Sequence, residues 1–158
     1  MKTTIPKPVI ICIGTPKVVG DSLGPRVGDK LIEKYGVDAY VYGKTSSPVT
    51  GVNCGKYFEH IKTYHKQSLV VAVDACLGRD KDVGTIKYSV EGLKAGSAIG
   101  KELGTIGDVG FLGVVAPCGD DNLRSLCSAD EKGVEYLSEK IAKKIQNLIS
   151  DLRLTYKF

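Results

Sequence analysis

The sequence lacks a strong excess of either charge and lacks any long apolar run. Its 158 residues contain 22 Lys and Arg against 18 Asp and Glu, and the basic residues are scattered along the chain. This pattern does not indicate a nucleic-acid groove. No segment approaches the roughly eighteen consecutive apolar residues of a membrane span, and residues 1–14 lack the pattern of a signal peptide. We therefore expect a cytoplasmic protein with neither nucleic acid nor membrane as a partner.

Two further kinds of site lack their usual patterns. The five cysteines are an odd number, are widely spaced and include no C-x-x-C pair, so neither a disulfide framework nor a zinc knuckle is predicted. Residues 14–21, GTPKVVGD, have neither the G-K-[ST] ending of a Walker loop nor the G-x-G-x-x-G dinucleotide pattern. No nucleotide cofactor is predicted.

The first half of the chain alternates between patterns of buried strands and patterns of helices. Short apolar runs predict strands at residues 9–14 and 69–75, with another strand at 38–44 between them. One helix is expected to begin near Pro25, and Asn53 is expected to cap a second. Because strand and helix alternate, we predict an α/β fold with a mostly parallel sheet and right-handed crossovers.

The second half predicts two more strands and a closing helix. Residues 85–90 alternate as an edge strand does, and residues 109–116 form another buried run. The glycine-rich stretch between them is expected to be a long structured loop beside a site. Residues 128–131 are interpreted as a capping box that starts the closing helix, whose apolar face is Val134, Leu137, Ile141, Ile145 and Leu148. One domain over residues 1–158 is the simplest interpretation.

Two aspartates are placed where a ligand would bind in such a fold. Asp21 follows the strand at 9–14, and Asp74 is predicted to stand at the carboxyl end of the strand at 69–75. In open parallel sheets, ligands bind outside the carboxyl ends of strands near a switch in strand order. A carboxyl with a raised pKa beside a charged carboxylate suits general acid/base hydrolysis. The alternative is structural: Asp21 caps the helix near Pro25, and Asp74 ends its strand by binding loop amides.

Three segments resemble a known family over nearly the whole chain. ICIGTPKVVGDSLGPRVGDKL (11–31), SSPVTGVN (46–53) and the segment at 71–115 that begins VAVDACLGRD resemble the sporulation protein YyaC family. More distantly, residues 20–25, 72–77 and 95–101 resemble the P-D-A-L-G-P loop, the A-[IV]-D-A-L strand end and the P-G-S-G-V-G-N loop of the spore germination protease. This chain has Ala95 and Ala98 where that glycine loop has Pro and Gly, and it is much shorter than the protease.

The resemblance implies a fold, an activity and a set of site residues. The fold would be the three-layer α/β sandwich of phosphorylase/hydrolase-like type, shared with hydrogenase-maturation endopeptidases. The activity would be a sporulation-associated hydrolase of a peptide or protein substrate, in the forespore or mother cell of a spore-forming bacterium. Asp21 and Asp74 would be catalytic. The expected substrate-binding residues are Gly20, Ser22, Gly96, Ser97 and Gly100. The alternative is a non-catalytic sporulation factor that binds a peptide or small ligand in the same cleft.

No metal or cofactor is predicted. The hydrogenase-maturation relatives bind nickel with two acids and a later histidine, whereas His60 and His65 precede the strand at 69–75 and are expected to be solvated residues near a helix end. Two carboxylates and water would suffice for weak Mg²⁺ or Ca²⁺ binding, which stays open. Cys76 and Cys118 lie near the same crevice, but without a nearby histidine a buried apolar role is favoured over a thiolate nucleophile.

Overall fold

The computed structural model describes residues 1–94 and 105–158. In chain order the strands are β1 (Thr3–Thr4), β2 (Val9–Cys12), β3 (Tyr40–Tyr42), β4 (Val70–Gly78), β5 (Ile86–Ser89), β6 (Leu93–Lys94), β7 (Thr105–Ile106), β8 (Val109–Pro117) and β9 (Tyr156–Lys157). The α-helices are α1 (Leu23–Asp29), α2 (Cys54–Tyr64), α3 (Asn122–Cys127) and α4 (Glu131–Thr155). Short 3₁₀ turns η1 (Gly20–Ser22) and η3 (Asp80–Asp82) and a π-helical turn η2 (Lys30–Lys34) complete the described elements.

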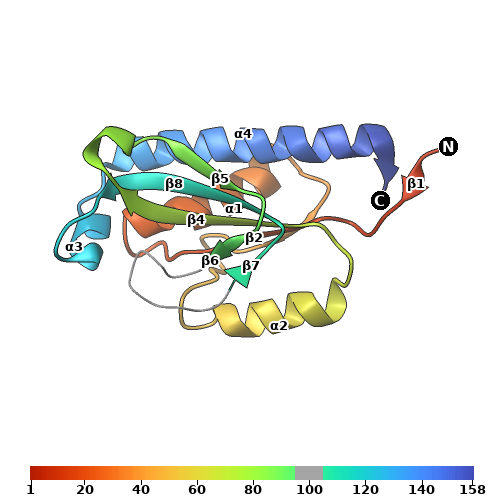
Figure 1. The fold of residues 1–158 in the computed structure, drawn as a ribbon, viewed down its shortest axis with the longest axis horizontal. Helices are drawn as coiled ribbons and strands as arrows, with labels where there is room; N and C mark the ends of the chain where they lie inside the picture. Colours follow the sequence, from red (N-terminus) through yellow and green to blue (C-terminus); the bar gives the residue numbers. More distant parts are fainter. Residues whose placement is uncertain (95–104) are drawn as a thin grey trace.

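The main sheet has the strand order β3-β2-β4-β8-β5. All neighbouring pairs are parallel except β5, which runs antiparallel to β8 at the edge. The mostly parallel sheet predicted from the alternating patterns is therefore confirmed. Two small ladders were not predicted: β6 pairs antiparallel with β7, and β1 pairs parallel with β9 where the chain ends lie side by side (Figure 1).

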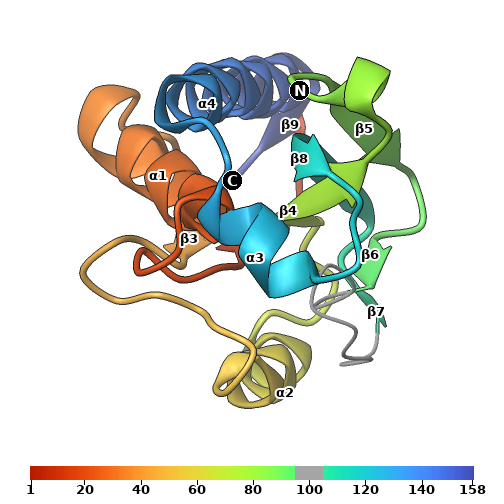
Figure 2. The ribbon, with the colours of Figure 1, turned by 90° about the vertical axis from the view of Figure 1, so that its left-hand side faces the viewer.

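Helices cover both faces of this sheet (Figure 1, Figure 2), which makes the three-layer sandwich that was expected. In β4 the side chains of Val71 and Val73 pack in the core under α1 and α4, whereas Val70 and Ala72 pack in the core under α2. This alternation follows from the period of two in a strand. Because both faces are buried, β4 reads as a continuous apolar run.

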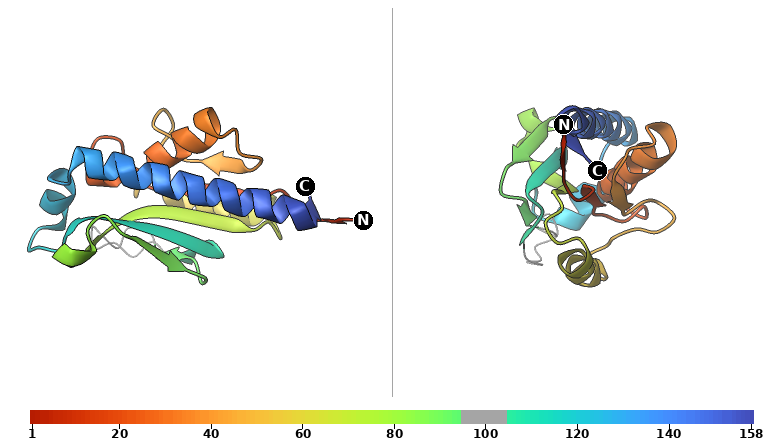
Figure 3. Two further views of the ribbon diagram at one scale, coloured as in Figure 1. Left: turned by 90° about the horizontal axis from the view of Figure 1, so that it is seen from above. Right: turned by 90° about the vertical axis from the view of Figure 1, so that its right-hand side faces the viewer.

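The closing helix α4 extends along the length of the sheet (Figure 3). Its buried face includes Val134, Leu137, Ile141 and Ile145, as the periodicity predicts, and Leu148 is half-buried beside it. Within the described ranges, neither α4 nor another helix has the length and apolar character needed to cross a membrane.

Two helix starts differ from the prediction. Asn53 occupies the position before α2, but its Oδ1 accepts from the Thr50 amide at 2.8 Å and makes no cap bond to the helix. The helix α4 is capped by Asp130, which accepts from the Gly133 amide at 2.8 Å. Ser128, expected to begin a capping box there, instead ends the short helix α3, because Asp130 is nearer to the first free amides of α4.

The strand β4 is longer than expected, and this changes the position of Asp74. It continues to Gly78, so Asp74 is the fifth of its nine residues and not its end. The physical reason is β8, which pairs with β4 from Val71 through Gly78, well beyond the last β2 partner at Val73. Asp74 therefore lies where β2 ends, inside a strand that continues along β8.

Candidate active site

Asp21 is held against the end of β2 by a close backbone approach. Gly14 adopts a φ of +145°, and a Cβ at this residue would lie 2.0 Å from the carbonyl oxygen of Asp21. Only glycine permits this contact. The amide of the next residue, Thr15, donates to Oδ2 of Asp21 at 2.9 Å. Burial raises the pKa of Asp21 above its ordinary value, and the Thr15 amide, which stabilises the carboxylate, partly opposes that rise.

Asp21 lines a pocket of about 340 Å³. The pocket is formed by the loop after β2, the loop before α2 and the helix α3, and Figure 2 faces the end of the molecule where α3 lies. Its lining residues are Thr15, Lys17, Val18, Asp21, Thr50, Gly51, Val52, Leu123 and Leu126. Val52 and Leu123 are exposed at 93% and 55%. Asp21 is the one carboxyl among the described lining residues, whose surface is otherwise largely apolar apart from Thr15, Lys17 and Thr50.

Asp74 is almost fully buried, with 5% of its surface exposed. Its Oδ1 accepts from the Ala75 amide at 2.9 Å. By strand alternation Asp74 shares its face of β4 with Val70 and Ala72, the residues that pack toward α2. The side chain of Asp74 therefore points to the α2 side of the sheet.

The two acids lie in the same part of the molecule. The Ile13 amide donates to the Val73 carbonyl oxygen at 2.8 Å, and Cys12 is paired with Val73. Ile13 therefore lies beside Asp74, and Thr15 follows two residues later. With about 3.8 Å per residue and about 4.8 Å between strands, Thr15, whose amide binds Asp21, lies within about 12 Å of Asp74. The turn η1 that carries Asp21 also contacts β4. Among the described residues, however, Asp74 does not line the pocket of Asp21. Their convergence on one substrate stays a prediction.

The other expected binding residues divide into two groups. Ser22 is buried, and its hydroxyl donates to the Val19 carbonyl and accepts from Arg26 Nε. Gly20 is buried against α3, where an added Cβ would lie 2.9 Å from the Leu126 carbonyl oxygen. These contacts pack the loop, and substrate contact by either residue stays a prediction. Gly96, Ser97 and Gly100 lie outside the described residues.

Cys76 lies two residues after Asp74 on the same face of β4. Burial raises the pKa of the Cys76 thiol to about 11; Lys87 lowers it, while Asp74 and Cys118 raise it further. A thiol with this pKa is protonated at neutral pH, which agrees with the apolar role expected for Cys76. Cys118 is exposed. Lys87 was not predicted as a site residue, although its place in the alternating edge strand at residues 85–90 was a usable signal.

The two histidines lie near one tyrosine of β3. His65 Nε2 lies 2.6 Å from Tyr42 Oη, and His60 Nε2 lies 3.2 Å from the same oxygen. His60 is exposed, so its expected solvation is confirmed, whereas His65, the residue after α2, is half-buried and less solvated than expected. In residues 1–94 and 105–158, no group of three or more His, Cys, Asp or Glu side chains could hold a metal ion.

The fold is shared with two classes of solved protein. The chain is similar to the [NiFe] hydrogenase maturation protease HycI of Thermococcus kodakarensis KOD1, with 17% identity and a TM-score of 0.58 over 92% of this chain and 94% of the other. It is also similar to peptidyl-tRNA hydrolase from Acinetobacter baumannii, with 11% identity and a TM-score of 0.63 over 95% and 90%. At these identities the likeness defines the fold alone, an α/β sandwich with a mostly parallel sheet.

Sequence comparison then gives the family. Residues 1–146 match the family described as "Protein of unknown function (DUF1256)", and the chain belongs to this family. The "Uncharacterized protein YyaC" of Bacillus subtilis (strain 168) is 44% identical over 107 residues, which are 68% of this chain and 52% of that protein. The resemblance to YyaC is confirmed. The chain spans about half the length of this curated relative.

Proposed function

We propose that the protein is an endopeptidase-like hydrolase that uses Asp21 and Asp74 as its acid/base pair. The observation that carries this proposal is the site of Asp21, a carboxyl with a raised pKa that lines a largely apolar pocket beside the strand of Asp74. Perturbed carboxyls in such pockets are typical of catalytic sites. The fold shared with a maturation protease supports the same class of reaction.

The two acids would take complementary roles. One of them, as a carboxylate, accepts a proton from a water molecule, while the other holds a proton. The water oxygen then adds to the carbonyl carbon of a peptide bond. When the C–N bond breaks, the protonated acid transfers its proton to the leaving nitrogen. The products are a carboxyl terminus and an amine, and the pair of acids still carries one proton.

The pocket beside Asp21 would select the substrate. Val18, Val52 and Leu123 present apolar surface next to the carboxyl, and a substrate side chain of the same character would bury itself there. The resemblance to the spore germination protease supports a role in sporulation, in the forespore or the mother cell. Small acid-soluble spore proteins are therefore the first substrates to test.

The experiment is a cleavage assay with matched variants. The purified protein is incubated with small acid-soluble spore proteins, and fragments are identified by mass spectrometry. Asp21→Asn and Asp74→Asn should each abolish fragments without unfolding the chain. Asp151→Asn, an exposed change on α4, should leave them unchanged. Fragments that persist in both site variants would come from a contaminant, and the hydrolase proposal would then be wrong.

A second candidate is a non-catalytic sporulation factor that binds a peptide or small ligand in this cleft. The observation that favours it is Asp74, which is 5% exposed and does not line the pocket within the described part of the chain. The same assay separates the two candidates. Saturable binding of the spore proteins without fragments would support the binding factor.

A further inference from the structure

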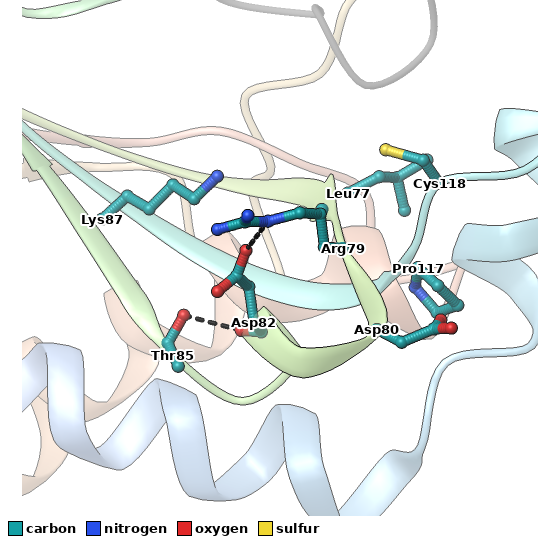
Figure 4. A pocket seen from close by; sticks show the side chains of 9 residues that line it. Leu77, Arg79, Asp80, Asp82, Thr85, Lys87, Pro117 and Cys118 are labelled. Carbon is teal, nitrogen blue, oxygen red and sulfur yellow. Dashed lines mark hydrogen bonds and ion pairs between the residues drawn. The ribbon is translucent and has the colours of Figure 1, made fainter.

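A second pocket lies toward the β8 and β5 edge of the sheet, whereas the pocket of Asp21 lies beyond the end of β2. It has a volume of about 750 Å³ and is formed where β4 and β8 end and the turn η3 leads into β5. Figure 4 shows the side chains that line it: Leu77, Arg79, Asp80, Asp82, Thr85, Lys87, Pro117 and Cys118. Ligands of parallel sheets bind at this end of the strands.

Among the described residues that line this pocket, one cation has no ion-pair partner. Arg79 Nε donates to Asp82 Oδ2 at 2.8 Å, so these two charges are paired. Lys87 forms no ion pair with any carboxylate of the described ranges, and its side chain extends toward the guanidinium of Arg79 (Figure 4). Asp80 lies at the far end of the pocket, beside Pro117. The end near Lys87 is therefore positive, and the terminal nitrogens of Arg79 remain as further donors.

Strand register places Lys87 on the same face of the sheet as Asp74. Asp74 is paired with Leu112 in β8, and Leu112 is paired with Lys87 in β5. Residues directly opposite each other in a sheet project from one face. Two strand spacings separate Lys87 from Asp74, about 10 Å, which an extended peptide covers in about three residues.

We propose that this pocket binds a carboxylate of the peptide substrate, with Lys87 as the residue that recognises it. The role of this pocket in peptide cleavage rests on the proposed function. The inference adds a substrate class, which is a peptide with an acidic residue about three positions from the bond that Asp74 and Asp21 attack. Lys87 and the terminal nitrogens of Arg79 would donate to the carboxylate, as charge-assisted hydrogen bonds require.

Binding can be measured without any cleavage. N-acetylglutamate amide is titrated into the isotope-labelled protein, and amide shifts are followed by NMR, with N-acetylglutamine amide as the neutral match. Shifts should map to Arg79, Lys87 and Cys118 for the acid alone. Lys87→Gln should weaken binding about tenfold, the usual effect of losing a hydrogen bond to a charged group. Lys81→Gln removes an exposed charge on η3 outside the pocket lining and should have no such effect.

The outcomes separate this inference from the proposed function. Equal shifts with both probes, or equal affinity in the Lys87→Gln variant, would overturn the carboxylate site even if peptides are cleaved. A carboxylate site confirmed by the titration, with no cleavage of any spore protein, would overturn the hydrolase and leave a binding pocket. If both hold, changing the acidic residue of a cleaved peptide to Gln should raise KM and leave kcat unchanged.

Discussion

The substitution Gly14→Ala tests whether the end of β2 holds Asp21 in place. The added Cβ would lie 2.0 Å from the Asp21 carbonyl oxygen, and contacts below 3.0 Å are essentially never found for real Cβ atoms. The turn η1 must therefore move by about 1 Å, the difference between these two distances. That displacement is enough to break the hydrogen bond of the Thr15 amide to the carboxylate, now 2.9 Å long.

The cost of this change has two parts. A side chain at the φ of +145° recorded for Gly14 strains the backbone by about 1–3 kcal/mol. Loss of a hydrogen bond to a charged group costs about 1.5–3 kcal/mol. We expect the free energy of unfolding to fall by roughly 2.5–6 kcal/mol from these two sources together. A 1 Å error in the position of a catalytic group also lowers a rate by about a hundredfold.

Urea unfolding of Gly14→Ala beside Gly36→Ala measures the difference. Gly36 also has a positive φ, +52°, but an added Cβ would meet no atom of the described residues within 4 Å. Its substitution should cost only the left-handed backbone strain of about 1–2 kcal/mol. If the two variants lose equal stability, the contact between Gly14 and Asp21 does not constrain the site, and the reasoning is refuted.

Three other groups give predictions of their own. Because burial raises the pKa of Asp21 above 3.8, its contribution to stability is fully present below its unfolded pKa and is lost as pH rises through the folded pKa. Asp21→Asn should therefore gain stability relative to the wild type between acid and neutral pH in denaturant titrations, and a constant difference would contradict this. Iodoacetamide at neutral pH should alkylate exposed Cys118 and leave Cys76, with its pKa of about 11, unmodified in mass spectra of the folded protein. Gly55 lies in α2, and beyond the helix's own backbone no described atom lies within 4 Å of an added Cβ, so Gly55→Ala should stabilise the fold by about 0.5–1 kcal/mol in urea unfolding.

Local patterns were sufficient to predict the central strands. β2, β4 and β8 are apolar along most of their length because helices cover both faces of the sheet. Such apolar runs can be recognised in the sequence without the structure. The helix α3 was missed because its six residues bury only Leu126, which leaves no periodicity to detect. Asp74 was predicted to lie at the end of its strand because its charge interrupts the apolar run. The strand continues to Gly78 because it pairs with β8.

The candidate site depends on contacts that no local pattern contains. The position of Asp21 after a buried strand was predicted from the sequence. The pocket around Asp21 is also formed by α3 and the loop before α2, which the local pattern does not indicate. The shared face of Asp74 and Lys87 follows from the register of three strands, one of them antiparallel. A shift of one residue would have placed Lys87 on the opposite face.

The most direct test of the acid pair is the pKa of the Asp21 carboxyl, measured by NMR in the wild type and in Asp74→Asn. If the two carboxyls face one substrate, removing the charge of Asp74 should lower the pKa of Asp21, because a neighbouring negative charge disfavours ionisation. Burial would still hold that pKa above its ordinary value of 3.8. An identical pKa in both proteins would mean that the acids do not interact, and it would contradict the shared acid/base mechanism.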